Sequence, residues 1–307
     1  MSALISDREL VTLESSNGRW RADVHPVGAS LVALWFDDAE IAVTPYSENF
    51  YAFAGATLAP WPNRLEDGTW VFEDQARKHR INDERGHNAN HGLVFDRKFV
   101  TSHSTADSIT FERELGGDEV FPFMAMVKVH YLLTENGFTQ TISLKNRSHL
   151  IIPAAFGSHP YFLLEQDSQV QINAREVFTN SSRGLPIERV ALDSSGIAKQ
   201  GFNSAAELEV DDCFTALIEN ADSKYSTLIT RPGINGTVEI WQDCDFEFVM
   251  LFAFHERGEN GRMCLAVEPQ TSPANSLRSG DHLIWLAPDE TTSASWGVKI
   301  RNGISNG

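Results

Sequence analysis

Apolar and polar residues alternate with a period of two along most of this chain, and this pattern limits the possible folds more than any other feature. The alternating windows are rich in strand-forming residues and cover 126–133, 139–144, 168–172, 246–254 and 293–300. Helical periodicity is scarce, and the window 203–208 is long enough for one or two turns of helix. Because strand windows follow one another without helices between them, the sequence predicts an all-β fold with a large antiparallel β-sandwich or barrel.

Turn signals separate the strand windows. Glu135-Asn136-Gly137 lies between the first two windows, as expected for a hairpin. Composition does not shift abruptly, and the chain has neither a flexible linker nor an internal repeat. We therefore expect a single domain over residues 1–307. The polar stretch 73–90 is the best candidate for a long functional loop.

Charge and cysteine content narrow the partners. The 307 residues include 42 Asp and Glu against 25 Lys and Arg, and a net charge of -17 would repel nucleic acid. No stretch approaches the roughly 18 consecutive apolar residues of a membrane helix, and the first residues lack the pattern of a signal peptide. Three widely spaced cysteines fit neither a disulfide framework nor a paired zinc site. We expect a cytoplasmic protein that binds neither nucleic acid nor membranes.

Several common chemistries lack their motifs here. The sequence has no phosphate-binding Gly-Lys-Ser/Thr loop, no Gly-x-Gly-x-x-Gly fingerprint and no Gly-x-Ser-x-Gly elbow. The run 255–259 begins like a zinc-protease helix but has Glu where the second His must stand. Nucleotide, hydride and serine-nucleophile chemistry are therefore disfavoured.

Five short clusters instead place an ionisable side chain among Gly, Pro or aromatic residues. Their ionisable members are Arg64, His91, His159, Asp211 and Glu268. His159 precedes a proline, which favours extended backbone at a strand end or edge. Glu268 closes an otherwise apolar strand, 263–267, where an unpaired carboxylate would cost several kcal/mol.

Each of the five also has an ordinary structural explanation. A histidine beside a glycine or proline often only packs, and a buried glutamate often belongs to a structural ion pair. Arg64 is followed by Glu66 and Asp67, which could pair with it locally. Asp211 belongs to an Asp doublet, and such doublets usually face water. Their joint occurrence at ends of strand windows is what favours one shared site.

The motifs around these residues have a recognisable order. They are Asn63-Arg64-Leu65 followed by Gly68, Asn90-His91-Gly92, His159-Pro160-Tyr161-Phe162, Asp211-x-x-Phe214, and Glu268-Pro269-Gln270 followed by Pro273. In this order and spacing the chain resembles the aldose 1-epimerase (galactose mutarotase) family, over roughly residues 28–296.

The resemblance implies a galactose mutarotase-like supersandwich that interconverts the α and β anomers of a hexose, with a small sugar as its partner and no cofactor. It implies that Glu268 is the general base at the anomeric hydroxyl and His159 the general acid at the ring oxygen. His91 would lie beside that oxygen, while Arg64 and Asp211 would hold sugar hydroxyls. The better-known galactose enzymes carry a small polar residue in place of the proline after the histidine, and usually His in place of the second Asp.

These residue types suit the reaction. Ring opening moves one proton from the anomeric oxygen and another onto the ring oxygen, so a base and an acid must flank C1. A carboxylate accepts a proton readily, and a histidine with a pKa of about 6.5 can donate one. Positioned proton transfer supplies typically about 10²- to 10⁴-fold per group. Trp61, Tyr161 and Phe162 could also face the sugar, although we expect core packing for at least two of them.

Two other enzymatic functions stay open. A hexose-6-phosphate 1-epimerase would use the same acid and base with extra cations, for which Arg77, Lys78 and Arg80 are candidates. A glycoside hydrolase would use the carboxyl pair of Asp211 and Glu268, held about 5 to 9 Å apart.

Two further alternatives do not depend on proton transfer. A non-catalytic carbohydrate-binding β-sandwich would keep the pocket, although binding alone has no need for an acid and a base. A metal-dependent lectin or isomerase would use His91, His159 and Glu268 as ligands.

Overall fold

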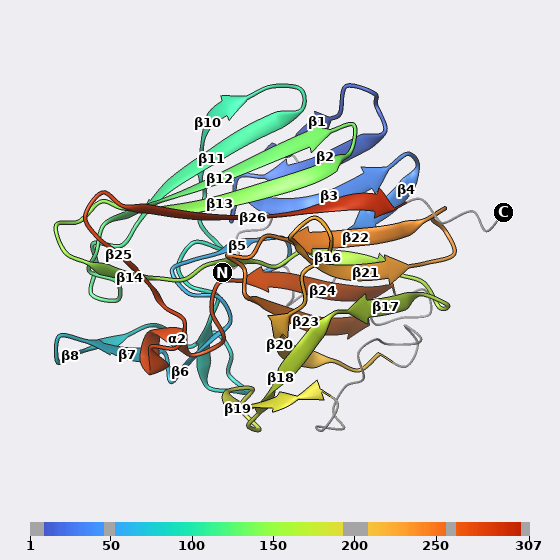
Figure 1. Ribbon diagram of the computed structural model, residues 1–307. Helices are drawn as coiled ribbons and strands as arrows, with labels where there is room; N and C mark the ends of the chain where they lie inside the picture. The colour runs from blue at the N-terminus through green and yellow to red at the C-terminus, as the bar shows by residue number, and fades with distance from the viewer. Residues whose placement is uncertain (1–8, 46–52, 193–207, 256–261, 302–307) are drawn as a thin grey trace.

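The computed structural model describes residues 9–45, 53–192, 208–255 and 262–301, and within them regular structure is almost all strand (Figure 1). The larger sheet has twelve strands. Its order is β1 (Val11–Glu14), β2 (Trp20–His25), β3 (Ser30–Phe36), β4 (Ala39–Ala42), β16 (Tyr161–Leu164), β24 (Met263–Gln270), β23 (Phe248–His255), β20 (Asp211–Leu217), β18 (Ala174–Asn180) and β19 (Pro186–Ala191), and β15 (Gly157–Ser158) joins β24 to β5 (Thr57–Leu58).

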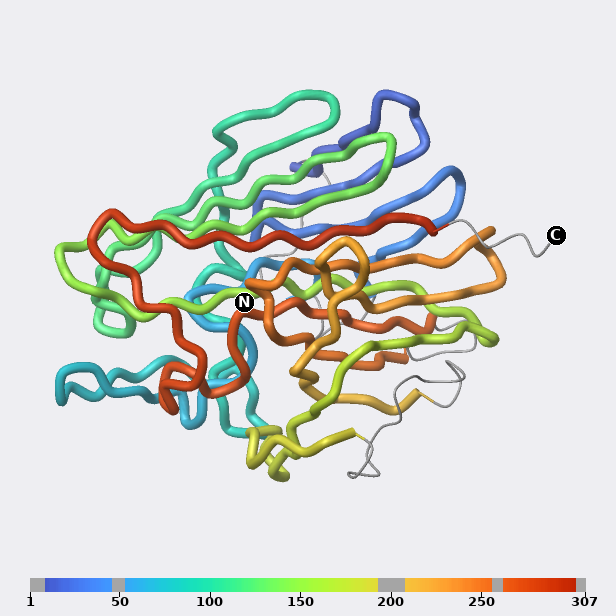
Figure 2. Tube along the Cα trace, in the orientation of Figure 1, coloured from blue at the N-terminus to red at the C-terminus, as the bar shows by residue number. Residues whose placement is uncertain are grey.

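The second sheet has eight strands. Its order is β10 (Val100–Ser104), β11 (Ser108–Leu115), β12 (Ala125–Thr134), β13 (Gly137–Asn146), β26 (Thr291–Arg301), β22 (Thr237–Gln242), β21 (Tyr225–Thr230) and β17 (Gln169–Ile172). Strands distant in the sequence are neighbours here, as the red C-terminal β26 beside the green β13 shows in Figure 2. Every pairing between the named strands of both sheets is antiparallel, which confirms the predicted class.

Three two-stranded sheets and one short helix complete the described part of the chain. They are β6 (Arg64–Glu66) with β9 (Asn88–Asn90), β7 (Thr69–Phe72) with β8 (Gln75–Lys78), β14 (Ile152–Ala154) with β25 (Ile284–Leu286), and the helix α2 (Ser276–Ser279). No helix among the described residues combines the length and apolar character that crossing a bilayer requires.

The predicted strand windows are confirmed. Each of the five is a strand whose ends lie within two residues of the expected ones. The predicted hairpin is also present, because Thr134 pairs with Gly137 across the turn. The interpretation of 73–90 as one long loop is wrong, since this stretch contains β8 and β9. The expected helical window, 203–208, lies outside the described residues except for its last position.

The main apolar core lies between the two large sheets. Phe162 of the twelve-stranded sheet and Trp296 of the eight-stranded sheet have ring centroids 6.4 Å apart, and both are almost fully buried. Along β24, Leu265 and Val267 belong to this core. The alternate residues of β24, among them Glu268, therefore face away from it.

The structure corrects one prediction about β24. Glu268 does not close the strand, because β24 continues through Pro269 to Gln270. The amide of Val267 points toward the carbonyl of Pro160, so the nitrogen of Pro269 faces the same side. Pro269 has no N–H to donate to this neighbour, and its place in the strand is next to the interruption between β15 and β16.

Candidate active site

Neighbouring strands place His159 opposite Glu268. β24 pairs with β15 before the interruption and with β16 after it, in one continuous register, and His159 occupies the gap. Opposed residues of an antiparallel pair project to the same face. Accordingly, His159 Nε2 lies 3.2 Å from Glu268 Oε1, although the two residues are far apart in the sequence.

Burial controls the protonation of this pair. The side chains of His159 and Glu268 are 6% and 3% exposed. Desolvation raises the pKa of Glu268 to about 8, and the negative charge of Asp211 adds to the increase. Desolvation likewise lowers the pKa of His159 to about 4. Between these values the pair holds one proton, so it is ready to exchange that proton with a bound molecule.

Gln270 holds the second oxygen of the carboxyl group. Its Nε2 donates a hydrogen bond of 3.0 Å to Glu268 Oε2, and both residues are buried. They lie two positions apart on β24 and therefore share a face. This bond leaves Oε1 turned toward His159. The sequence motif contained Gln270, but its role required the strand to continue through Pro269.

His91 joins the pair from the β6–β9 sheet. Its ring lies edge-on to that of His159 with centroids 5.1 Å apart. The amide of Asn63 donates to His91 Nδ1 at 3.3 Å, so this nitrogen carries a lone pair. Burial lowers the pKa of His91 well below its ordinary value, and the neutral ring therefore carries its proton on Nε2.

The backbone around His91 is special. His91 has φ +68° and Gly92 has φ +74°. A side chain at Gly92 would place its Cβ 2.1 Å from the carbonyl oxygen of Ala59. Only glycine permits this close approach, which explains why a glycine follows the histidine.

Arg64 and Asp211 form the outer part of the cluster. Arg64 Nη2 lies 3.1 Å from Asp211 Oδ2, and the two side chains are 19% and 47% exposed. The interpretation that Arg64 pairs locally with Glu66 and Asp67 is wrong. Both carboxylates pair instead with Arg183 and Arg278. Solvent therefore reaches the cluster at Arg64 and Asp211, whereas the side chains of His159 and Glu268 are buried.

The aromatic residues divide as expected. Trp61 and Phe162 belong to the main core, whereas Tyr161 stacks on His159 with centroids 5.0 Å apart. Phe53 was not predicted, yet its ring lies 4.5 Å from that of His91. No local motif marks this phenylalanine. All five predicted site residues are thus connected through direct contacts or shared neighbours.

Comparison with known proteins identifies the family of this chain. A sequence profile described as aldose 1-epimerase matches residues 9–299. The chain belongs to the aldose 1-epimerase family. The uncharacterized protein YihR of Escherichia coli is 28% identical over 282 residues, which cover 90% of this chain and 88% of YihR.

Solved structures show the same fold as this family member. A galactose mutarotase-like protein from Clostridium acetobutylicum matches with a TM-score of 0.79 and 22% identity, over 93% of this chain and 94% of that one. Galactose 1-epimerase from Lactobacillus acidophilus matches with a TM-score of 0.76 and 19% identity, over 99% and 98%. These likenesses confirm the mutarotase-like sandwich.

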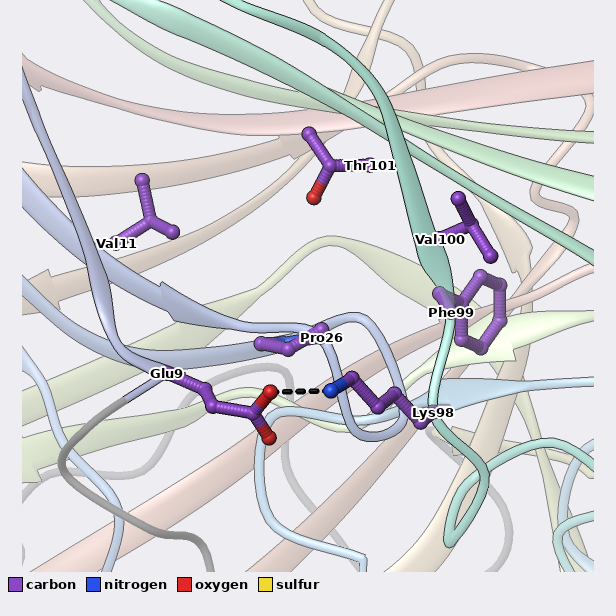
Figure 3. A pocket seen from close by; sticks show the side chains of 7 residues that line it. All are labelled: Glu9, Val11, Pro26, Lys98, Phe99, Val100 and Thr101. Atoms are coloured by element: carbon purple, nitrogen blue, oxygen red, sulfur yellow. Dashed lines mark hydrogen bonds and ion pairs between the residues drawn. The ribbon is translucent and has the colours of Figure 1, made fainter.

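A separate cavity of this aldose 1-epimerase family member lies elsewhere on the molecule (Figure 3). It measures about 560 Å³ and is lined by Glu9, Val11, Pro26, Lys98, Phe99, Val100 and Thr101. Two of the lining residues, Glu9 and Lys98, form an ion pair. The cavity contains none of the predicted site residues, and its two charges already neutralise each other.

The metal-dependent lectin or isomerase and the hexose-6-phosphate 1-epimerase gain no support from the described part of the chain. It contains no group of three or more His, Cys, Asp or Glu side chains arranged to hold a metal ion. Arg77, a candidate phosphate ligand, instead donates to the Glu119 carbonyl and to Gln75.

Proposed function

We propose that this protein interconverts the α and β anomers of an uncharged hexose by acid–base catalysis, without a cofactor. The observation that supports this proposal best is the 3.2 Å contact between His159 Nε2 and Glu268 Oε1. The anomeric oxygen and the ring oxygen are both bonded to C1. An acid and a base that serve these two oxygens must therefore lie close together, as these atoms do.

Ring opening uses the ion-pair form, in which Glu268 is a carboxylate and His159 an imidazolium. Oε1 accepts the proton of the anomeric hydroxyl while Nε2–H donates its proton to the ring oxygen. The bond between C1 and the ring oxygen breaks, and C1 becomes an aldehyde carbon. Rotation about C1–C2 then presents the other face, and closure reverses both transfers.

The proton count stays constant through this cycle. Opening converts the ion pair into a carboxylic acid and a neutral imidazole, which together still hold one proton. Burial favours this neutral form, and the contact between Nε2 and Oε1 gives a direct path back to the ion pair. Turnover therefore requires no proton from solvent.

The remaining residues bind the sugar. Arg64 and Asp211 can make charge-assisted hydrogen bonds to hydroxyls while C1 stays free to rotate. His91, with its proton on Nε2, is a neutral donor beside the ring of His159 and suits an oxygen that gains charge. The positive charge of Arg64 is already balanced by Asp211, which favours an uncharged sugar over a 6-phosphate.

Polarimetry on fresh α-D-glucose and α-D-galactose tests the proposal directly. The protein should accelerate the change in optical rotation, and Glu268→Gln and His159→Asn should each lower kcat by about 10²- to 10⁴-fold. Full activity of Glu268→Gln would refute the assigned base. A faster reaction with glucose 6-phosphate than with glucose would favour the phosphosugar alternative, and release of reducing sugar from a glycoside would favour hydrolysis.

A further inference from the structure

The turn between β18 and β19, residues 181–185, is fastened to the β6–β9 sheet by one arginine. Arg183 belongs to this turn, and its guanidinium donates four hydrogen bonds: Nε to Gly86 O at 2.8 Å, Nη1 to Glu66 Oε1 at 3.2 Å, and Nη2 to Asp67 Oδ1 at 2.7 Å and to His87 O at 3.1 Å. Asn88 Nδ2 donates back to the Arg183 carbonyl at 3.0 Å. The rigid fork of an arginine makes such a multiple attachment possible, and a lysine cannot reproduce it.

The next residue of this turn, Gly184, contacts Arg64. Its carbonyl accepts a hydrogen bond of 3.3 Å from Arg64 Nη1. A Cβ at Gly184 would lie 2.7 Å from both Cζ and Nε of Arg64. The guanidinium of Arg64 therefore occupies the space that any other residue at 184 would fill with its side chain.

From these contacts we propose that residues 181–185 form a positioning element for Arg64 and so set the affinity for the sugar. Arg183 fixes the turn, and Gly184 supplies one hydrogen bond and the free space. The ion pair with the half-exposed Asp211 alone would hold the long side chain of Arg64 only weakly. A guanidinium held in place before binding loses less entropy when a sugar arrives. This inference rests on the proposed function, in which Arg64 holds hydroxyls.

A pair of glycine variants isolates the contact. Gly184 and Gly280 have nearly the same φ, +72° and +79°, but a Cβ at Gly280 would meet no atom within 4 Å. Gly184→Ala and Gly280→Ala should therefore lose similar stability from backbone strain. Gly184→Ala alone should also raise KM, because the added Cβ displaces Arg64 from its place beside the sugar hydroxyls. Loss of one charge-assisted hydrogen bond between Arg64 and the sugar corresponds to about a tenfold higher KM, and kcat should change less.

Arg183→Lys should raise KM in the same direction, because it keeps the charge but loses the fork. In an Arg64→Ala background, neither Arg183→Lys nor Gly184→Ala should raise KM further, since both act through Arg64. Additive effects on KM, or an equal effect of Gly280→Ala, would show that the turn has no role beyond general stability.

The inference can fail separately from the proposed function. Absence of any mutarotation by the wild-type protein would overturn the proposed function. A crystal structure of Gly184→Ala would then still test whether the turn positions Arg64. Displacement of the Arg64 guanidinium from Asp211 would support the positioning role, and an unmoved guanidinium would refute it.

Discussion

Replacing Glu268 by glutamine should stabilise the protein at alkaline pH while it lowers kcat by about 10²- to 10⁴-fold. The carboxyl group is buried, and glutamine has almost the same shape. The amide of glutamine can accept a hydrogen bond from Gln270 and donate one to neutral His159. Both contacts of the carboxyl group are therefore kept. The substitution therefore removes the ability to ionise and little else.

The magnitude follows from the pKa values. The ordinary pKa of this carboxyl group is 4.5, and burial raises it to about 8 in the folded protein. Its contribution to stability is thus fully present below pH 4.5 and is lost as the pH rises to 8, because the unfolded chain ionises first. The difference amounts to about 5 kcal/mol above pH 8 and to less than about 1 kcal/mol at pH 5.

Urea unfolding of wild type and Glu268→Gln at pH 5 and pH 9 measures this effect. The stability of the variant relative to wild type should grow with pH by several kcal/mol, while contributions from all other titrating groups cancel. Glu188→Gln, an exposed glutamate on β19, makes the same change of charge and should give a small difference at both pH values. A gap between wild type and Glu268→Gln that stays constant with pH would refute the burial argument.

Three further outcomes test the site. The kcat/KM for mutarotation should form a plateau between pH about 4 and pH about 8. Below pH 4 the pair of His159 and Glu268 gains a second proton, and above pH 8 it loses the proton that the two groups share. A profile that only rises or only falls with pH would contradict this assignment. Gln270→Leu should lower kcat and move the alkaline limb upward, since the amide donor lowers the pKa of Glu268; an unmoved limb would show that the bond does not tune the base. Gly92→Ala should lower the free energy of unfolding in urea by more than about 1 kcal/mol, because its Cβ would overlap the carbonyl oxygen of Ala59. The same overlap should displace His91 and lower kcat. A variant as stable as wild type would contradict the close approach.

Strand periodicity made the architecture predictable where one face of a strand is buried. All five alternating windows are strands because each covers the main core with every second residue. The β7–β8 hairpin escaped prediction. Its turn uses Glu73 and Asp74 at φ +48° and +60°, where Gly or Asn would be the usual signal, and the surrounding residues are polar.

The candidate site was predictable where a residue contradicts its own neighbourhood. A histidine before proline and a glutamate after an apolar run are unusual locally, so they could be singled out without coordinates. Gly184 could not, because its importance comes from a guanidinium 120 positions earlier in the chain. Phe53 likewise contacts His91 through the fold alone.

The two departures from the better-known galactose enzymes have different consequences. Asp212 alternates with Asp211 along β20 and lies opposite Leu251 of the main core, so its side chain is on the face away from Glu268. The second Asp therefore makes no direct change to the groups that would meet the sugar. Pro160 lies directly beside the proposed acid–base pair, because it follows His159 in the chain. It interrupts the strand beside β24, and in that gap the imidazole of His159 meets the carboxyl group of Glu268. Substitution at Pro160 should consequently affect proton transfer, whereas substitution at Asp212 should affect stability.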